Sequence, residues 1–222
     1  MKTKLGEIKL IIFDWSGVIS DDRQPVYEAN MKILERYDKP RISYNDWWSD
    51  LKMTLRTFLK SQEIPLSREQ INEIFKECYD EVFQSGILPT IYLETLRILE
   101  LLSQKGMRLA AVSAHPLQNL EREARIYKIR NYFIVMLGWA TAHKSKSILK
   151  VCKDLAISPE NAIYVGDMIM DIRSAKEARV HSVGIARDNN ESYHSIEILE
   201  KENPEILARN LDDMLEKLGV CA

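Results

Sequence analysis

The chain alternates short, fully apolar segments with longer segments in which apolar residues recur every three or four positions. The segments 8–13, 108–112 and 162–165 have the length and the β-branched content of buried parallel strands. Two weaker candidates for strands are 133–137 and 182–185. Strands that are apolar on both sides are covered on both faces, so the pattern predicts an α/β fold with a parallel sheet.

Helical periodicity fills the segments between these strands. Apolar residues repeat at helical spacing over 93–102, over 145–155 and over the final segment, 204–218. Strands that alternate with helices of this length are typical of right-handed β-α-β units, whose helices lie on both faces of the sheet. We expect the final helix to pack back on the sheet.

The first strand is followed by a long segment that shows only helical pattern. We expect helices over 26–37 and 44–61, and a third helix that begins at Ser67, where Ser67 and Gln70 form a capping box. Adjacent positions on a helix point about 100° apart. The neighbouring tryptophans at 47 and 48 are therefore not expected to share one small core.

This helical segment divides the chain into two predicted domains. Residues 21–86 would form a helical cap over the carboxyl edge of the sheet, and residues 1–20 and 87–222 would form the α/β core. Such an insert leaves the first strand within the core while it adds a second domain.

Composition narrows the class of protein. The chain has 222 residues, of which 45% are hydrophobic and 29% charged, and its formal net charge is −2. Charges of both signs are mixed along the chain, which argues against attraction to nucleic acid or to an acidic membrane surface. We expect a small molecule as partner, and a chain that is a monomer or a homodimer.

The cysteines and the N-terminal segment indicate a cellular location. Cys78, Cys152 and Cys221 lie far apart and none belongs to a C-x-x-C pair, so neither a zinc site nor a disulfide framework is predicted. The apolar run near the N-terminus is too short for a signal peptide or a membrane span. We expect a soluble, cytoplasmic protein without a membrane partner.

The first chemically informative stretch is I-I-F-D-W-S-G-V-I, around Asp14. A carboxylate follows an apolar strand directly, and Gly17, three positions later, allows a tight turn. Open α/β sheets bind their ligands at the carboxyl ends of central strands, which is where Asp14 is expected. Taken alone, this Asp could equally cap a helix or close a turn.

The second stretch is A-I-Y-V-G-D-M-I-M-D-I, which places Asp167 at the end of another apolar strand and Asp171 four residues later. Carboxylates that lie together at strand ends repel one another unless a cation lies between them. Mg²⁺ is bound in proteins by one or two carboxylates together with phosphate oxygens, so these residues predict a magnesium site. The alternative is a helix cap at Asp167 and a solvated Asp171.

Ser113 and Lys144 are candidate phosphate ligands. Ser113 ends the strand R-L-A-A-V and precedes a predicted helix with Pro116 in its first turn, where backbone N–H groups can form an oxyanion pocket. Lys144 begins another predicted helix, where a positive charge opposes the helix dipole and suggests a role in binding. Ser113 could instead be a simple N-cap, and Lys146 is a close rival of Lys144.

The segments around Asp14, Ser113, Lys144 and Asp167, taken in the order of the chain, resemble those of the haloacid dehalogenase-like phosphohydrolase superfamily. The resemblance extends from residue 8 to about 218 and is strongest in F-D-x-x-G-V and V-G-D-x-x-x-D. The helical insert, and L-P before E-T-L-R-I-L-E-L-L-S-Q-K-G, resemble the branch of phosphoglycolate phosphatase and β-phosphoglucomutase. The resemblance implies a Rossmann-like parallel sheet with helices on both faces, an inserted α-helical cap, and the four motifs together at the carboxyl edge.

The resemblance also implies a Mg²⁺-dependent hydrolase that acts on a small phosphorylated molecule. Asp14 would attack phosphorus and form an aspartyl-phosphate, which water then hydrolyses. Mg²⁺ would be held by Asp14, the backbone carbonyl of Ser16 and Asp167, with Asp171 nearby or bound through water. Lys144 would also neutralise charge in the transition state. The residues implied to bind the phosphoryl group are Ser113, Ala114, Gly17 and Lys144.

Ser16 departs from the family's pattern, in which a second Asp follows the nucleophile by two positions. That Asp protonates the leaving oxygen and then activates water, and serine is too weak an acid to do so. General acid–base catalysis is typically worth about 10²–10⁴-fold. The backbone carbonyl that would bind Mg²⁺ is unaffected by the change.

Three functions therefore remain open. The first is a phosphatase whose substrate has a good leaving group or whose acid comes from elsewhere, with His115 as one candidate. The second is a C–P bond hydrolase, because phosphonoacetaldehyde hydrolases have D-W-A-G at this place and form a Schiff base through a cap lysine, here Lys52 or Lys60. The third is a catalytically weak protein that binds a phosphorylated metabolite.

Overall fold

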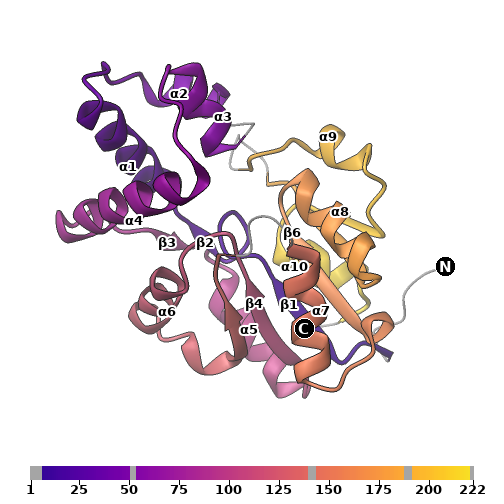
Figure 1. Ribbon diagram of the computed structural model, residues 1–222. Helices are drawn as coiled ribbons and strands as arrows, with labels where there is room; N and C mark the ends of the chain where they lie inside the picture. The colour runs from indigo at the N-terminus through magenta and orange to yellow at the C-terminus, as the bar shows by residue number, and fades with distance from the viewer. Residues whose placement is uncertain (1–6, 51–53, 140–143, 188–191, 221–222) are drawn as a thin grey trace. The chain divides into compact units, whose positions relative to one another are not determined.

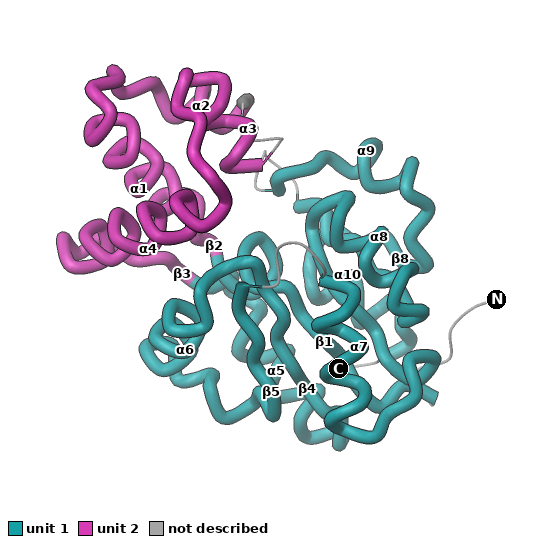
Figure 2. Tube along the Cα trace, in the orientation of Figure 1, with its two compact units in different colours: residues 1–20, 91–222 teal, residues 21–90 magenta. Residues whose placement is uncertain are grey.

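The computed structural model describes residues 7–50, 54–139, 144–187 and 192–220. The chain divides into two compact units, which we call unit 1 (residues 1–20 and 91–222) and unit 2 (residues 21–90), shown in Figure 2. The sequence predicted that the helical insert ends at residue 86, and unit 2 extends to Thr90.

Unit 1 contains a six-stranded sheet in the order β5-β4-β1-β6-β7-β8, and all of its strand pairs are parallel (Figure 1). Every predicted strand is present, although β1 begins later and β7 earlier than expected. The strands are β1 (Leu10–Phe13), β4 (Arg108–Val112), β5 (Phe133–Leu137), β6 (Ala162–Gly166), β7 (His181–Ile185) and β8 (Ile206–Ala208).

Successive side chains of the strands divide the core of unit 1 into two layers. On one face, Ile11 and Phe13 pack in a cluster with residues of α5 (Thr95–Gln104), α6 (Leu117–Ile126) and α10 (Leu211–Lys217). On the other face, Leu10 and Ile12 pack in a cluster with residues of α7 (Lys144–Asp154) and α8 (Ile169–Ala178). This alternation is the geometry of a pleated strand, and it confirms the predicted α/β fold with helices on both faces.

The register of the central strands determines which residues meet at the carboxyl edge. Phe13 of β1 is level with Ala111 of β4 and with Val165 of β6. From β1 the sheet extends through β4 and β5 on one side and through β6, β7 and β8 on the other. Open α/β sheets bind ligands where the strand order reverses in this way, so the residues that follow β1, β4 and β6 occupy the expected position of a site.

Unit 2 consists of α1 (Arg23–Arg36), α2 (Tyr44–Asp50), α3 (Leu55–Ser61) and α4 (Arg68–Gln84), and α1 packs on α4. The single helix predicted over 44–61 is wrong, because α3 starts separately after Thr54. The Thr54 side chain accepts a hydrogen bond from the Thr57 N–H at 3.3 Å and caps the new helix. Residues 51–53 lie outside the described part of the chain.

The two short strands β2 (Ser20–Asp21) and β3 (Thr90–Ile91) form a two-stranded sheet. The boundaries between unit 1 and unit 2 fall inside these strands. The chain therefore leaves unit 1 and returns to it through paired segments.

The adjacent tryptophans of α2 differ in burial, as predicted. Trp47 is fully buried and its ring lies 5.3 Å from the ring of Tyr27, measured between centroids. Trp48 is only partly buried and stacks on Tyr44 at a centroid distance of 6.3 Å. Adjacent helical positions point about 100° apart, which explains this difference.

The last predicted helix is wrong in its first half. The segment 204–218 contains β8 followed by α10, which begins at Leu211. Asn210 caps α10, since its side chain accepts a hydrogen bond from the Asp213 N–H at 2.9 Å.

The remaining short helices of the described residues are α9 (Ile196–Glu200), η2 (Arg130–Tyr132) and η3 (Pro159–Asn161). Among the described helices, none combines the length and the apolar character that crossing a bilayer requires.

The capping box predicted at Ser67 is present at the start of α4. Ser67 Oγ accepts a hydrogen bond from the Gln70 N–H at 3.2 Å, and Gln70 Oε1 accepts one from the Ser67 N–H at 2.9 Å. We expect Ser67→Ala to lower the free energy of unfolding by about 1 kcal/mol, because one helix donor loses its acceptor. Chemical denaturation followed by circular dichroism measures this. The control Glu73→Ala, at an exposed position of the same helix, should change it by less than about 0.5 kcal/mol; an equal change in both variants would contradict the prediction.

Candidate active site

Asp14 is the first residue after β1 and is buried at the carboxyl edge of the sheet. Its backbone N–H donates to the Val165 carbonyl at 2.8 Å, which ties it to β6. Its Oδ1 accepts a hydrogen bond from the Trp15 backbone N–H at 2.8 Å, and its Oδ2 accepts one from Lys144 Nζ at 3.0 Å. Both carboxylate oxygens are thus held in place by the protein.

Asp167 and Asp171 lie beside Asp14. One carboxylate oxygen from each of these three residues lies within 4.8 Å of the other two, and all three residues are buried. Asp167 directly follows β6, and Asp171 lies in the first turn of α8, where Asp171 Oδ2 accepts a hydrogen bond from the Met168 N–H at 2.9 Å. Because Asp171 is only 1% exposed, the alternative that it is solvated is wrong.

Lys144, the first residue of α7, points its ammonium group into this cluster. Its Nζ lies 3.0 Å from Asp14 Oδ2 and 2.6 Å from Asp171 Oδ1. It also lies 5.7 Å from the centroid of the buried Tyr164 ring, within the range of a cation–π interaction. Lys146, its rival in the sequence, is exposed, so the structure brings Lys144 to the carboxylates and leaves Lys146 on the surface.

Burial and mutual repulsion govern the protonation of these groups. Burial raises the pKa of Asp14, although the charge of Lys144 opposes the shift. Burial, together with the charges of Asp171 and Asp14, raises the pKa of Asp167 well above its ordinary value. Burial favours the neutral amine of Lys144, but Asp14 and Asp171 outweigh it and raise the pKa of that group. Lys144 brings one positive charge to three carboxylates, so a further cation is electrostatically favoured.

The donor set fits a hard divalent cation such as Mg²⁺. Asp167 Oδ2 is buried and has no hydrogen-bond partner within the described residues. A buried acceptor without a partner is costly, and a cation would remove that cost. Oxygen ligands from carboxylates are those that Mg²⁺ prefers in proteins.

Gly17 makes room for Asp167. It has a φ of +75°, and a Cβ atom there would lie 2.1 Å from Asp167 Oδ2. Its N–H donates to the Ser20 carbonyl at 2.9 Å, which closes the turn after Asp14. A glycine is therefore required both by the backbone conformation and by the close approach of the carboxylate.

Ser113 and Ala114 follow β4 at the same edge of the sheet. Ser113 is buried, and its Oγ accepts a hydrogen bond from the His115 N–H at 3.2 Å, while Ala114 is exposed. The expectation that Pro116 lies in the first turn of a helix is wrong by one position. Pro116 precedes α6 as its N-cap, with an extended ψ of 136°.

Ser16 contacts His115. Ser16 Oγ lies 3.2 Å from His115 Nε2, within hydrogen-bond distance. Burial lowers the pKa of His115, although the charges of Glu123 and Asp14 oppose the shift. The candidate acid named from the sequence thus lies beside the serine that departs from the family's pattern.

Two charged residues that the sequence analysis did not single out hold the loop after Asp14. Glu123 of α6 is fully buried and accepts a hydrogen bond from Trp15 Nε1. The Arg187 guanidinium lies 3.4 Å from the centroid of the Tyr92 ring and donates to the Val18 carbonyl at 3.2 Å. Glu123 is detectable as a charge among the apolar positions of its helix, whereas Arg187 has no local signal because its partners are distant in the sequence.

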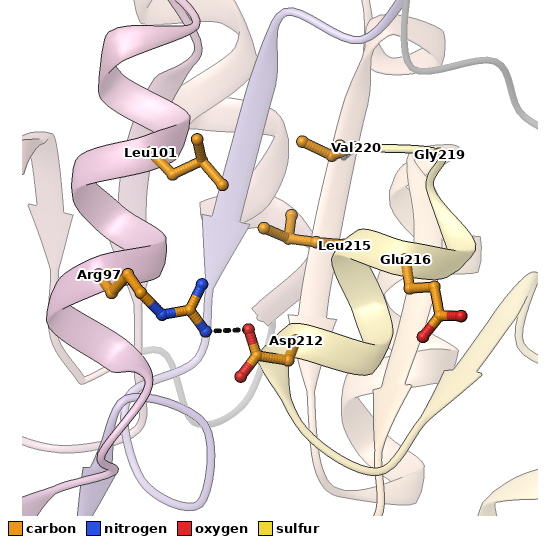
Figure 3. A pocket seen from close by; sticks show the side chains of 7 residues that line it. All are labelled: Arg97, Leu101, Asp212, Leu215, Glu216, Gly219 and Val220. Carbon is orange, nitrogen blue, oxygen red and sulfur yellow. Dashed lines mark hydrogen bonds and ion pairs between the residues drawn. The ribbon is translucent and has the colours of Figure 1, made fainter. Parts of the chain in front are cut away.

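A separate cavity of about 240 Å³ lies between α5 and α10 (Figure 3). An ion pair between Arg97 and Asp212 borders it, and Leu101, Leu215 and Val220 provide apolar walls. None of the carboxylates of the candidate site lines this cavity. The charged residues that line it are Arg97, Asp212 and Glu216.

Comparisons with known proteins agree on one family. The model of the haloacid dehalogenase-like hydrolase family matches residues 11–185. A protein of Caldanaerobacter subterraneus subsp. tengcongensis, named as a presumed pyrophosphatase, PpaX, is 25% identical over 225 residues, which cover 97% of this chain and 96% of that protein. A phosphoglycolate phosphatase of Shigella boydii is 26% identical over 185 residues, which cover 78% of this chain and 71% of that protein.

The fold is also similar to that of solved structures. A haloacid dehalogenase-like family protein from Streptococcus pneumoniae matches with a TM-score of 0.79 and 19% identity, over 95% of this chain and 98% of that chain. This likeness supports the fold assigned above.

A methyl group at Gly17 tests whether Asp167 binds a metal ion. We expect Gly17→Ala to abolish the stabilisation of the protein by MgCl₂, because the added Cβ displaces Asp167 Oδ2. The matched control is Gly106→Ala, since Gly106 has the same φ of +75° and a Cβ there would meet no atom within 4 Å. Each variant should lose roughly 1–2 kcal/mol from the left-handed backbone alone. Thermal melts in MgCl₂ and in EDTA should show a Mg²⁺-dependent rise in Tm for wild type and Gly106→Ala only; a similar rise in Gly17→Ala would contradict the site.

Proposed function

The chain belongs to the haloacid dehalogenase-like hydrolase family, and on that premise we propose that it is a Mg²⁺-dependent phosphohydrolase whose nucleophile is Asp14. The observation that carries the proposal is the contact of Asp14 with Lys144 beside Asp167 and Asp171. Phosphoryl transfer depends mainly on positioning and on charge stabilisation, and this cluster offers a carboxylate nucleophile together with a cation. The relatives named as phosphatases support the same class of reaction.

In the first step, a carboxylate oxygen of Asp14 attacks phosphorus, and the bond between phosphorus and the leaving oxygen breaks. The result is an aspartyl-phosphate and a released alcohol, acid or phosphate. The Trp15 N–H restrains the carboxylate, and Lys144 neutralises charge on the phosphoryl oxygens. Asp14, Asp167 and the Ser16 carbonyl would hold Mg²⁺, with Asp171 nearby, and the ion would screen the phosphoryl charge from the carboxylates.

In the second step, water attacks the phosphorus of the aspartyl-phosphate, which releases inorganic phosphate and restores the Asp14 carboxylate. We assign the phosphoryl group to the pocket predicted from the sequence, formed by Ser113, Ala114, Gly17 and Lys144. Ser113 and Gly17 follow neighbouring parallel strands, whose carboxyl ends meet at one edge.

The need of a leaving group for a proton limits which substrates the enzyme can hydrolyse. Ser16 is too weak an acid, and burial lowers the pKa of its neighbour His115. We therefore propose that the enzyme favours leaving groups that depart without protonation, such as those of acyl phosphates and phosphoanhydrides. The similarity to a protein named as a pyrophosphatase supports this class of substrate.

We propose that unit 2 is the predicted cap and carries the determinants of substrate choice.

The phosphonate alternative requires a lysine that forms a Schiff base. Of the two candidates, Lys60 lies on α3 with an exposed side chain, and Lys52 lies outside the described residues. The metabolite-binding alternative predicts Mg²⁺-dependent binding of a phosphate ester without its hydrolysis. Release of phosphate from phosphate esters, acyl phosphates or phosphoanhydrides separates the phosphatase from both alternatives, because a C–P bond hydrolase releases phosphate only from a phosphonate and a binding protein releases none.

We expect Asp14→Asn to lower phosphate release at least about 10³-fold, because the amide is not a nucleophile and cannot form the aspartyl-phosphate. Release from acetyl phosphate, pyrophosphate and an aryl phosphate should be measured in MgCl₂ and in EDTA. The matched control is Asp154→Asn, since Asp154 lies on the surface in an ion pair with Lys150. Release by Asp14→Asn at the rate of Asp154→Asn would refute the assigned nucleophile.

A carboxyl group at position 16 tests whether the missing acid limits the natural enzyme. We expect Ser16→Asp to raise kcat/KM for alkyl phosphate esters by about 10²-fold, and to change the rate for acetyl phosphate little, since acetate leaves without a proton. The ratio of the two rates is the measurement, so any general loss of active protein cancels. An unchanged ratio in Ser16→Asp would show that protonation of the leaving group does not limit the reaction.

A further inference from the structure

The proposed chemistry does not use Glu123, although this carboxylate is fully buried in α6 beneath the loop that follows Asp14. Its Oε2 accepts hydrogen bonds from Trp15 Nε1 at 2.6 Å and from Ser20 Oγ at 3.0 Å. Trp15 and Ser20 are the two ends of the loop 15–20. A single carboxylate oxygen therefore binds both ends of the loop.

The loop 15–20 is also closed by its own backbone. The Trp15 carbonyl accepts hydrogen bonds from the Ile19 N–H and from the Ser20 N–H, each at 2.9 Å. The Trp15 indole is fully buried, and its ring lies 5.8 Å from the ring of Phe133 of β5, measured between centroids. The indole thus packs against Phe133 of the sheet and bonds to Glu123 of α6.

Trp15 links this buried carboxylate to the nucleophile. Its indole donates to Glu123, and its backbone N–H donates to Asp14 Oδ1 at 2.8 Å. The next residue is Ser16, which contacts His115. A displacement of the Trp15 indole would therefore move the backbone group that restrains the Asp14 carboxylate.

We propose that Glu123 is a positioning residue for the reaction: through Trp15 and Ser20 it fixes the loop 15–20 and so holds Asp14 in the orientation for attack on phosphorus. A buried carboxylate is retained at a cost unless its hydrogen bonds are made, and the donors Trp15 Nε1 and Ser20 Oγ, which bond its Oε2, belong to one loop. The reach of the side chain, rather than its charge, sets the position of the loop. The proposal rests on the proposed function for its kinetic test.

Two substitutions of Glu123 distinguish the effect of its side-chain length from the effect of its charge. Glu123→Gln keeps an acceptor oxygen at the same distance from the helix and removes the charge, whereas Glu123→Asp keeps the charge and withdraws the oxygen by one methylene. We expect Glu123→Asp to lose about 10²-fold in kcat with KM unchanged, the loss that a displacement of about 1 Å causes. Glu123→Gln should keep kcat within about threefold of wild type. The substrate is the acyl phosphate or phosphoanhydride that wild type hydrolyses.

The control variant is Leu120→Ala, a buried position of the same helix that contributes to the core of unit 1. It should lose stability and keep the kcat of wild type per folded molecule. Trp15→Phe should lose kcat to the extent of Glu123→Asp, and the double variant should lose no more than either single variant, because both break one contact. A kcat equal to wild type in folded Glu123→Asp overturns the proposal, as does a loss confined to Glu123→Gln.

A second measurement does not depend on turnover. In ¹H–¹⁵N spectra, the indole N–H resonance of Trp15, assigned by its absence in Trp15→Phe, should move in Glu123→Asp and stay in place in Leu120→Ala. If wild type hydrolyses no phosphorylated compound, the proposed function fails, and this resonance still decides whether Glu123 holds the loop. An unmoved resonance in Glu123→Asp overturns the proposal.

Discussion

Repulsion among buried carboxylates is the constraint on which the candidate site depends. Asp14, Asp167 and Asp171 hold oxygens within 4.8 Å of one another at one edge of the sheet, an arrangement that would disperse without compensation. Lys144 compensates in part, with its ammonium group bound to Asp14 and Asp171. The backbone hydrogen bond from the Asp14 N–H to the Val165 carbonyl holds the first carboxylate beside the second against this repulsion, and the negative charge that remains favours a further cation. Burial and repulsion of this kind shift the pKa values of carboxyl groups, and strongly shifted pKa values cluster at functional sites.

Around this cluster, the loop 15–20 is fixed from several sides. Glu123 binds its ends from α6, and Arg187 binds its carbonyl groups at Gly17 and Val18 from the segment after β7. Arg187 is itself held by an ion pair with Glu94 at 2.7 Å. A carboxylate next to a loop with so many bonds has little orientational freedom, and the attack on phosphorus that we propose for Asp14 requires such restraint.

The sequence predicted the parts of the structure that depend on local pattern. Strands β1, β4 and β6 are runs of apolar residues, and the carboxylates after β1 and β6 follow from the position of such strands in an open sheet. The sequence does not predict β8, because its three residues, of which two are partly exposed, carry too little periodicity to distinguish a strand from a helix. The break between α2 and α3 depends on one capping threonine inside a continuous amphipathic pattern. Glu123, Arg187 and the contact between Ser16 and His115 join residues that are far apart in the chain, and no local signal encodes such partners.

The pairing of β2 with β3 has an evolutionary consequence. A segment whose first and last residues are neighbours adds little conformational cost to the fold that receives it, because the host chain is interrupted at one point only. Recombination between genes can then exchange the whole of unit 2 without changing the register of β1 and β6, the strands that precede Asp14 and Asp167. If unit 2 determines substrate choice, as we propose, new specificities can arise by transplantation of an intact module rather than by gradual mutation of the site.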